Sequence, residues 1–142
     1  MSPSTVLRVN KVALILLIAA LVCWVAFHFL TIGGGHDRGW EIWREIVQVF
    51  KRSRMPGWRQ MIAISGFLML SFLVSASPFA IPLLRSHRLF WWLAVLASGA
   101  ALAGFGTFVA GSHNRGYALD CLLASMVLNF AGLLCIRRLR PE

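Results

Sequence analysis

The stretch VALILLIAALVCWVAFHFLTI, residues 12–32, contains no acidic or basic side chain apart from one histidine. An α-helix rises 1.5 Å per residue, so about 20 residues cross a hydrocarbon core of roughly 30 Å. Arg8 and Lys11 precede the stretch, no small-x-small cleavage site follows it, and Cys23 lacks the preceding small residue of a lipoprotein signal. Residues 12–32 are therefore predicted to form an uncleaved first transmembrane helix.

Three further apolar runs follow, at residues 61–84, 89–110 and 117–136, and each is long enough for one bilayer. Within the second run, Pro78 has no N–H to donate to the carbonyl of Val74, so we expect a kink or an early helix end there. Ser75 and Ser77 could hydrogen-bond the freed carbonyls. The links that follow the second and third runs are short, which places consecutive helices antiparallel.

Residues 38–54, between the first two runs, sort completely into two faces on a helical wheel. One half is apolar and contains Trp40, Ile42, Trp43, Ile46, Val47, Val49 and Phe50. The other half contains Glu41, Arg44, Glu45, Gln48, Lys51 and Arg52. Asp37 can cap the start and MPG at 55–57 ends the pattern. We predict an interfacial helix, with Trp40, Trp43 and Phe50 in the headgroup boundary and Lys51 and Arg52 at the lipid phosphates; the alternative is a solvated loop helix.

Composition supports the membrane interpretation. The 142 residues are 58% hydrophobic and only 13% charged, which exceeds the apolar content that a small soluble core can bury. The net charge of +9 comes from bases that flank the apolar runs, so it indicates headgroup contact and not nucleic-acid binding. The fold class is predicted as an all-α membrane protein, a single polytopic domain over 1–142 with four transmembrane helices and one interfacial amphipathic helix between helices 1 and 2.

The distribution of bases gives a divided answer on orientation. If both termini are cytoplasmic, three of the four runs have their more basic flank inside, whereas the basic segment 51–59 lies outside. We favour cytoplasmic termini because the first helix usually dominates. All bases but Lys11 and Lys51 are Arg, a composition typical of GC-rich bacterial genomes, so the expected location is the inner membrane.

His28 and His113 are the candidate cofactor ligands. Both are expected near the same membrane face, and two imidazoles from neighbouring helices could hold a b-type haem or a metal. The competing interpretation makes His28 an interfacial side chain and His113 a loop residue. Three cysteines without a CxxC pair imply neither a disulfide framework nor a zinc site, and we expect no cofactor.

A small oligomeric transporter or channel is the second functional class considered. Asp120 is the only acid within an apolar run, and intramembrane acids mark ion paths. Asp120 is, however, well placed to pair with Arg115 or to cap the fourth helix. Asn129, in the middle of that helix, is expected to join helices by a hydrogen bond.

The third run carries small residues at every fourth position, namely Gly99, Ala103 and Thr107, with Gly104 beside them. Such a stripe lets another helix approach closely. No motif for hydrolysis or phosphate binding is present, so catalysis is not expected. The favoured function is a non-catalytic accessory or scaffold subunit of a membrane assembly, in contact with lipids and with a membrane-protein partner or further copies of itself.

Overall fold

The computed structural model describes residues 3–32, 38–52, 57–111 and 116–136. Apart from one isolated bridge between Thr31 and Arg38, the regular structure in these ranges is helical, which confirms the all-α prediction. Six helices lie within the described ranges: α1 (Pro3–Phe29), α2 (Glu41–Arg52), α3 (Trp58–Ala76), α4 (Ile81–Ser86), α5 (Arg88–Gly111) and α6 (Tyr117–Cys135).

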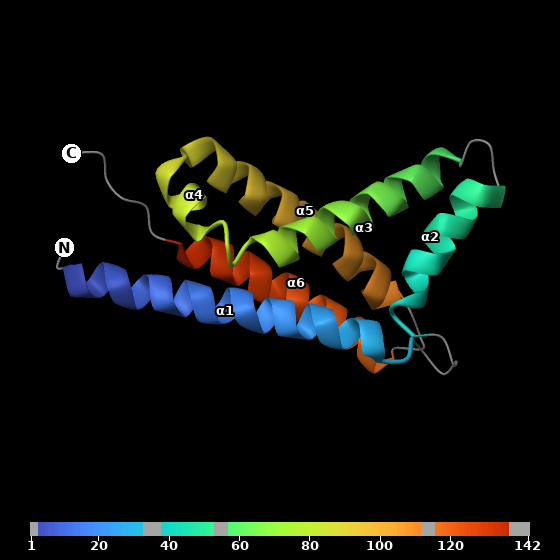
Figure 1. Cartoon of the computed structure of the whole chain (residues 1–142), viewed down its shortest axis with the longest axis horizontal. Helices are drawn as coiled ribbons and strands as arrows, with labels where there is room; N and C mark the ends of the chain where they lie inside the picture. Colours follow the sequence, from blue (N-terminus) through green and yellow to red (C-terminus); the bar gives the residue numbers. More distant parts are fainter. Residues whose placement is uncertain (1–2, 33–37, 53–56, 112–115, 137–142) are drawn as a thin grey trace.

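The antiparallel pair of α1 and α6 is the most extensively packed part of the structure (Figure 1). Gly132 permits the close approach, because a Cβ at this position would lie 2.7 Å from Cδ2 of Leu17 on α1. Nearby, the buried Oγ of Ser125 donates a 2.9 Å hydrogen bond to the carbonyl of Ala20. Lipid tails are as apolar as the side chains, so close packing and interhelical hydrogen bonds of this kind hold membrane helices together.

The apolar run 61–84 forms two helices, and the break between them lies where the sequence predicted a kink or an early helix end. The first, α3, ends at Ala76, and α4 begins at Ile81. The break follows from Pro78, which has no N–H to continue the helix, while Pro82 fits the first turn of α4, where a missing N–H costs nothing. Ser77 donates its hydroxyl to the carbonyl of Leu73, and not to that of Val74 as expected.

Helix α5 also packs against α6. Gly99 faces the ring of Phe130, where an added Cβ would lie 3.2 Å from a ring carbon. At the start of α5, the indole of Trp91 donates a 2.8 Å hydrogen bond to the carbonyl of Leu133. The interface therefore combines one small residue with a polar contact at the end of the helix.

Helix α2 crosses one end of the molecule at a steep angle to α1 and α6 (Figure 1). It covers residues 41–52 of the predicted 38–54, and the predicted cap Asp37 lies outside the described residues. Its polar and apolar side chains are sharply segregated, as the sequence predicts. Ile42 packs on the core, whereas Val47 and Phe50 are each 51% exposed. Most of the apolar face of α2 therefore has no cover from the rest of the described chain.

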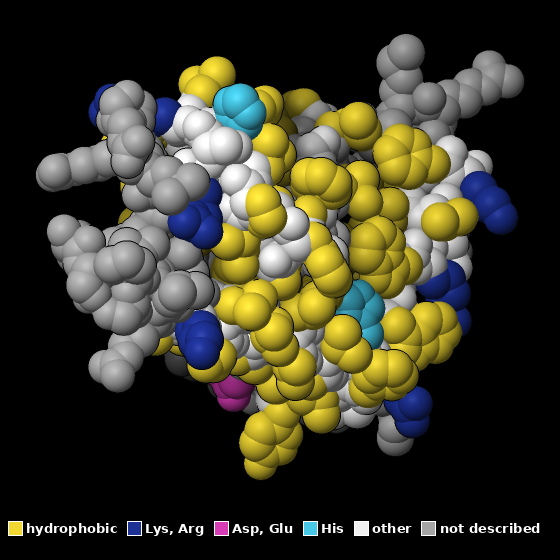
Figure 2. Space-filling model, turned by 60° about the vertical axis from the view of Figure 1, so that its left-hand side comes forward, with side chains coloured by type: hydrophobic (Ala, Val, Ile, Leu, Met, Phe, Trp, Pro, Cys, Tyr) yellow, Lys and Arg dark blue, Asp and Glu magenta, His cyan; other side chains and the backbone are white. Residues whose placement is uncertain are grey.

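Three helical segments are long and apolar enough to cross a membrane: Lys11–Phe29, Arg88–Thr107 and Tyr117–Cys135. The apolar part of α3, Gln60–Ala76, is shorter. Figure 2 shows hydrophobic side chains over most of the visible face, with basic side chains mainly toward its left and right margins. An apolar surface of this extent is unfavourable in water and suits a lipid environment. These features indicate a small helical protein located in a membrane.

Candidate functional site

The junction of α1 and α2 is built around His28, whose two ring nitrogens both have protein partners. Nδ1 lies 2.8 Å from the carbonyl oxygen of Trp24, and the indole N–H of Trp43 donates to Nε2 over 2.9 Å. Because Nε2 accepts a hydrogen bond here, Nδ1 must carry the proton of the neutral ring and donate to the carbonyl of Trp24. The imidazole thereby connects α1 to α2 in one tautomer.

Aromatic rings extend this junction to α3. Phe67 of α3 lies between two indoles, with ring centroids 5.5 Å from Trp24 and 5.2 Å from Trp43. Edge and tilted contacts at these distances are favourable aromatic geometries. We name Trp24, Phe27, His28, Trp43 and Phe67 the aromatic junction, because these five residues bring three helices together.

Backbone contacts fix the start of α2 against the end of α1. The N–H of Trp40 donates to the carbonyl of His28, and that of Gly39 to the carbonyl of Leu30, each over 3.1 Å. Gly39 is buried, and an added Cβ there would overlap the carbonyl oxygen of Phe27. The carbonyls at the end of a helix otherwise lack partners, so the chain entering α2 also completes α1.

The haem or metal hypothesis depends on His28 and His113. His113 lies outside the described residues, and a ligand at Nε2 of His28 would have to displace Trp43. Over the described ranges, no three His, Cys, Asp or Glu side chains are grouped closely enough to hold a metal ion. His28, which was considered as a ligand of a haem or metal, therefore makes a structural contact in this geometry.

The polar residues predicted on α6 have separate surroundings. Asp120 is exposed in the first turn, where the helix dipole favours an acid, and Arg115 lies outside the described residues. Asn129 is fully buried, and its Nδ2 donates a 3.0 Å hydrogen bond to Oγ of Ser98 on α5. Its Oδ1 has no hydrogen-bond partner among the described residues. Asn129 therefore links α5 to α6.

Only part of the predicted stripe on α5 contacts another helix of the chain. Gly99 meets α6, whereas Ala103, Gly104 and Thr107 are exposed. Gly104 lies on the wall of an apolar groove of about 620 Å³ between α3, α5 and α6. We call this the inner groove. The close approach predicted along the whole stripe is thus limited to its first residue within this chain.

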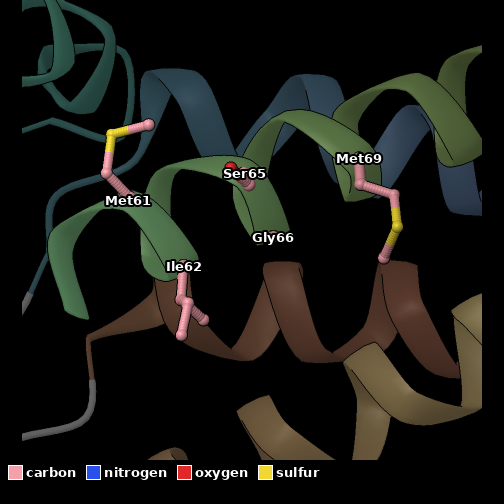
Figure 3. A pocket seen from close by; sticks show the side chains of 5 residues that line it. All are labelled: Met61, Ile62, Ser65, Gly66 and Met69. Atoms are coloured by element: carbon pink, nitrogen blue, oxygen red, sulfur yellow. The ribbon is translucent and has the colours of Figure 1, made fainter. Parts of the chain in front are cut away.

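A second, shallow depression lies on the outer side of α3 (Figure 3). Met61, Ser65 and Met69 follow one another at four-residue spacing, and Ile62 and Gly66 complete the lining. Ser65 and Gly66 are small, so the helix surface is hollow between the two flexible methionine side chains. We call this surface the outer face of α3.

Several residues that organise the structure were not singled out by sequence reasoning. Ala118, Leu122, Ser125 and Gly132 are buried on one face of α6, together with Asn129, which the sequence did single out. Their spacing of four, three, four and three is the signal that could have identified the face toward α1 and α5. No comparable local signal identifies Gly39 or Trp91. The partner of Trp91 is remote in sequence, and the atoms around Gly39 depend on the path of the chain between α1 and α2.

Comparison with protein families, curated proteins and solved structures finds no significant match to this chain. The functional interpretation therefore rests on the geometry of the described residues. That geometry provides a fixed α1–α2 junction and two adjoining apolar surfaces on α3 that share Ile62, Gly66 and Met69.

Proposed function

We propose that this protein is a non-catalytic accessory or scaffold subunit of a membrane assembly, with four spanning helices and α2 as an interfacial helix. The observation that carries the proposal is the unequal packing of the spans. The buried side chains of Ser125 and Asn129 and the partly buried indole of Trp91 make polar contacts between helices of the chain. In contrast, α3 makes far fewer contacts with the other helices than α1 and α6 make with each other. The spans thus form a stable core with one loosely attached helix available to a partner.

Helix α3 is proposed as the fourth span. Its apolar portion Gln60–Ala76 has 17 residues, the lower end of the range for a transmembrane helix. The helix runs between the end of the molecule that carries α2 and the end that carries α4 (Figure 1). With α3 included, the start of α1 and the end of α6 lie on one side, for which we propose the cytoplasm.

Helix α2 is proposed to lie in the headgroup boundary. Figure 1 shows α2 at the end of the molecule where α1 ends and α6 begins, inclined steeply to both helices, and this position supports an interfacial placement. Trp40, Val47 and Phe50 are at least 44% exposed, and burying such a face in lipid is favourable. The polar half carries Arg44, which is paired with Glu41 over 3.1 Å, and Lys51, which is free to contact phosphates.

The partner is proposed to contact the outer face of α3. Ser65 and Gly66 permit the close backbone approach that stabilises helix pairs in lipid. Met61 and Met69 on either side have flexible side chains that adapt to an opposing surface. A transmembrane helix of another membrane protein is therefore the proposed occupant.

Mild detergent extraction of the tagged full-length chain, followed by native mass measurement, tests this function. We expect a complex heavier than the 15.8 kDa chain that contains a second membrane protein. Ser65→Leu fills the outer face and should release this partner. Ser75→Leu makes the same change at another exposed serine of α3 outside the depression, and should retain it. A chain that is always monomeric, or equal retention by both variants, would overturn the proposal.

A further inference from the structure

The inner groove adjoins the outer face of α3, with which it shares Ile62, Gly66 and Met69. Its floor is formed by Leu122 and Met126 of α6, and its walls by α3 and α5. Every lining residue is Ala, Gly, Ile, Leu, Met or Phe, so the described walls offer no polar side chain to a ligand. An occupant of this groove must therefore be a hydrocarbon surface.

The extent of the groove corresponds to one leaflet of a bilayer. Along α3 the lining runs from Ile62, near the end that carries α2, to Leu70. At 1.5 Å per residue these eight steps span about 12 Å, close to half of a hydrocarbon core of roughly 30 Å. An acyl chain of the leaflet next to α2 fits this depth.

Two glycines keep the groove open. A Cβ added to Gly66 or to Gly104 would meet no other atom within 4 Å. Packing within the described chain therefore does not require glycine at either position, although glycine lowers helix stability by about 1 kcal/mol relative to alanine. Their missing side chains increase the free space that faces the groove.

The charge around the groove favours an anionic headgroup. The chain contains no Asp or Glu between Glu45 and Asp120, so neither α3 nor α5 carries an acid. Helix α2 ends with Lys51 and Arg52, and α3 begins six residues after Arg52, one turn before Ile62. Lys51 is exposed. The end of α2 and the start of α3 lie at the same end of the molecule (Figure 1), so the exposed Lys51 belongs to the end of the molecule at which the lining along α3 begins, and a basic side chain there favours an anionic headgroup.

We propose that the inner groove binds an acyl chain of an anionic phospholipid from the leaflet on which α2 lies. The apolar walls hold the chain and Lys51 contacts the phosphate. The lipid fills the space between α3 and the α5–α6 pair, and so supports α3 in the position from which its outer face meets a partner. This inference rests on the proposed membrane placement of α2 and α3.

The test uses the full-length protein in vesicles that contain phosphatidylglycerol with a photoactivatable group in its acyl chain. After irradiation, peptide mass spectrometry should locate the label mainly on groove residues of α3 and α5. Gly104→Leu fills the groove and should lose most of this label. Gly106→Leu is the matched control, because Gly106 also has open space at its Cβ but does not line the groove.

Two further measurements keep the result interpretable if Gly104→Leu folds poorly. The wild-type protein should label severalfold less with a phosphatidylcholine probe of the same chain, and Lys51→Gln should reduce that preference. Label spread evenly over the exposed faces of all helices, or a protein helix crosslinked within the groove, would overturn the lipid site. Alkaline carbonate extraction distinguishes the two proposals: release of the chain overturns the membrane placement and this inference together, whereas an integrated chain with an unlabelled groove overturns the lipid site alone.

Discussion

The indole N–H of Trp43 donates a 2.9 Å hydrogen bond to Nε2 of His28, and thereby joins α2 to the end of α1. The rings of the two residues are also stacked, with centroids 6.2 Å apart and planes 13° from parallel. Both residues were considered separately in the sequence, one as a candidate ligand and the other as an interfacial anchor. Their contact gives them one shared role, which is to set the direction in which α2 leaves α1.

Trp43→Phe should loosen α2 without removing the ring that contacts Phe67. The change deletes one hydrogen bond, which contributes about 1 kcal/mol, so amide exchange in α2 should become about fivefold faster. Hydrogen exchange with mass spectrometry on the protein in nanodiscs measures this. Trp40→Phe, one turn away, removes an indole whose ring contacts Arg44 and should leave exchange near the wild-type rate. Equal protection of α2 in both variants would contradict the role of the His28 contact.

Gly39→Ala should disrupt the same junction more severely. The added Cβ would overlap the carbonyl oxygen of Phe27, and backbone atoms cannot rotate away as a side chain can. We expect a loss of at least about 2 kcal/mol, in the range seen for steric overpacking, measured by unfolding in mixed micelles. Gly57→Ala is the control, since a Cβ there meets nothing within 4 Å. Similar stability of the two variants would show that the backbone at residue 39 adjusts at little cost.

The sequence was sufficient to predict the helices but not how they pack. Hydrophobic runs and the segregated faces of residues 38–54 have local physical causes, so helices appear where they were expected. Within an apolar span, however, buried and lipid-facing residues have the same composition. Ile62 is 63% exposed and Leu70 only 5% exposed, yet both are branched aliphatic residues on α3. Hydropathy alone therefore could not predict that α3 packs loosely on the other helices, or that the inner groove forms beside it.

The polar contacts show the same limit. On α6, Asn129 was expected to join helices by a hydrogen bond, because an amide within a membrane span needs a hydrogen-bond partner. Its partner Ser98 is 31 residues away in sequence, and Ser125 reaches Ala20 over 105 residues. Pairs so distant depend on the rotation of each helix about its own axis. One sequence without an alignment contains no local signal for that rotation.

Ser98→Ala should destabilise the α5–α6 interface, because it leaves Asn129 with no described hydrogen-bond partner in a fully buried position. The expected cost is about 1 kcal/mol, comparable with polar contacts measured between membrane helices. Replacing both residues, as Ser98→Ala with Asn129→Leu, removes both polar groups at similar volume and should recover most of that loss. Unfolding of the four proteins of this cycle gives the coupling energy. Additive losses in the double variant would mean that the two side chains do not interact.

The ends of α1 and α6 predict the topology of the whole chain. The start of α1 and the end of α6 lie at one end of the molecule, whereas α2 lies at the other (Figure 1). If α3 crosses the membrane as proposed, together with the three longer apolar helices, the number of crossings is even. Reporters fused at residue 1 and at residue 142 should therefore be active on the same side, which we expect to be the cytoplasm, and a reporter inserted after Gly57 should be active on the opposite side. If α3 instead lay on the membrane surface, three crossings would remain and the two terminal reporters would report opposite sides. In that case the inner groove would not extend through one leaflet of the bilayer. This one measurement therefore tests both the fold and the proposed lipid site.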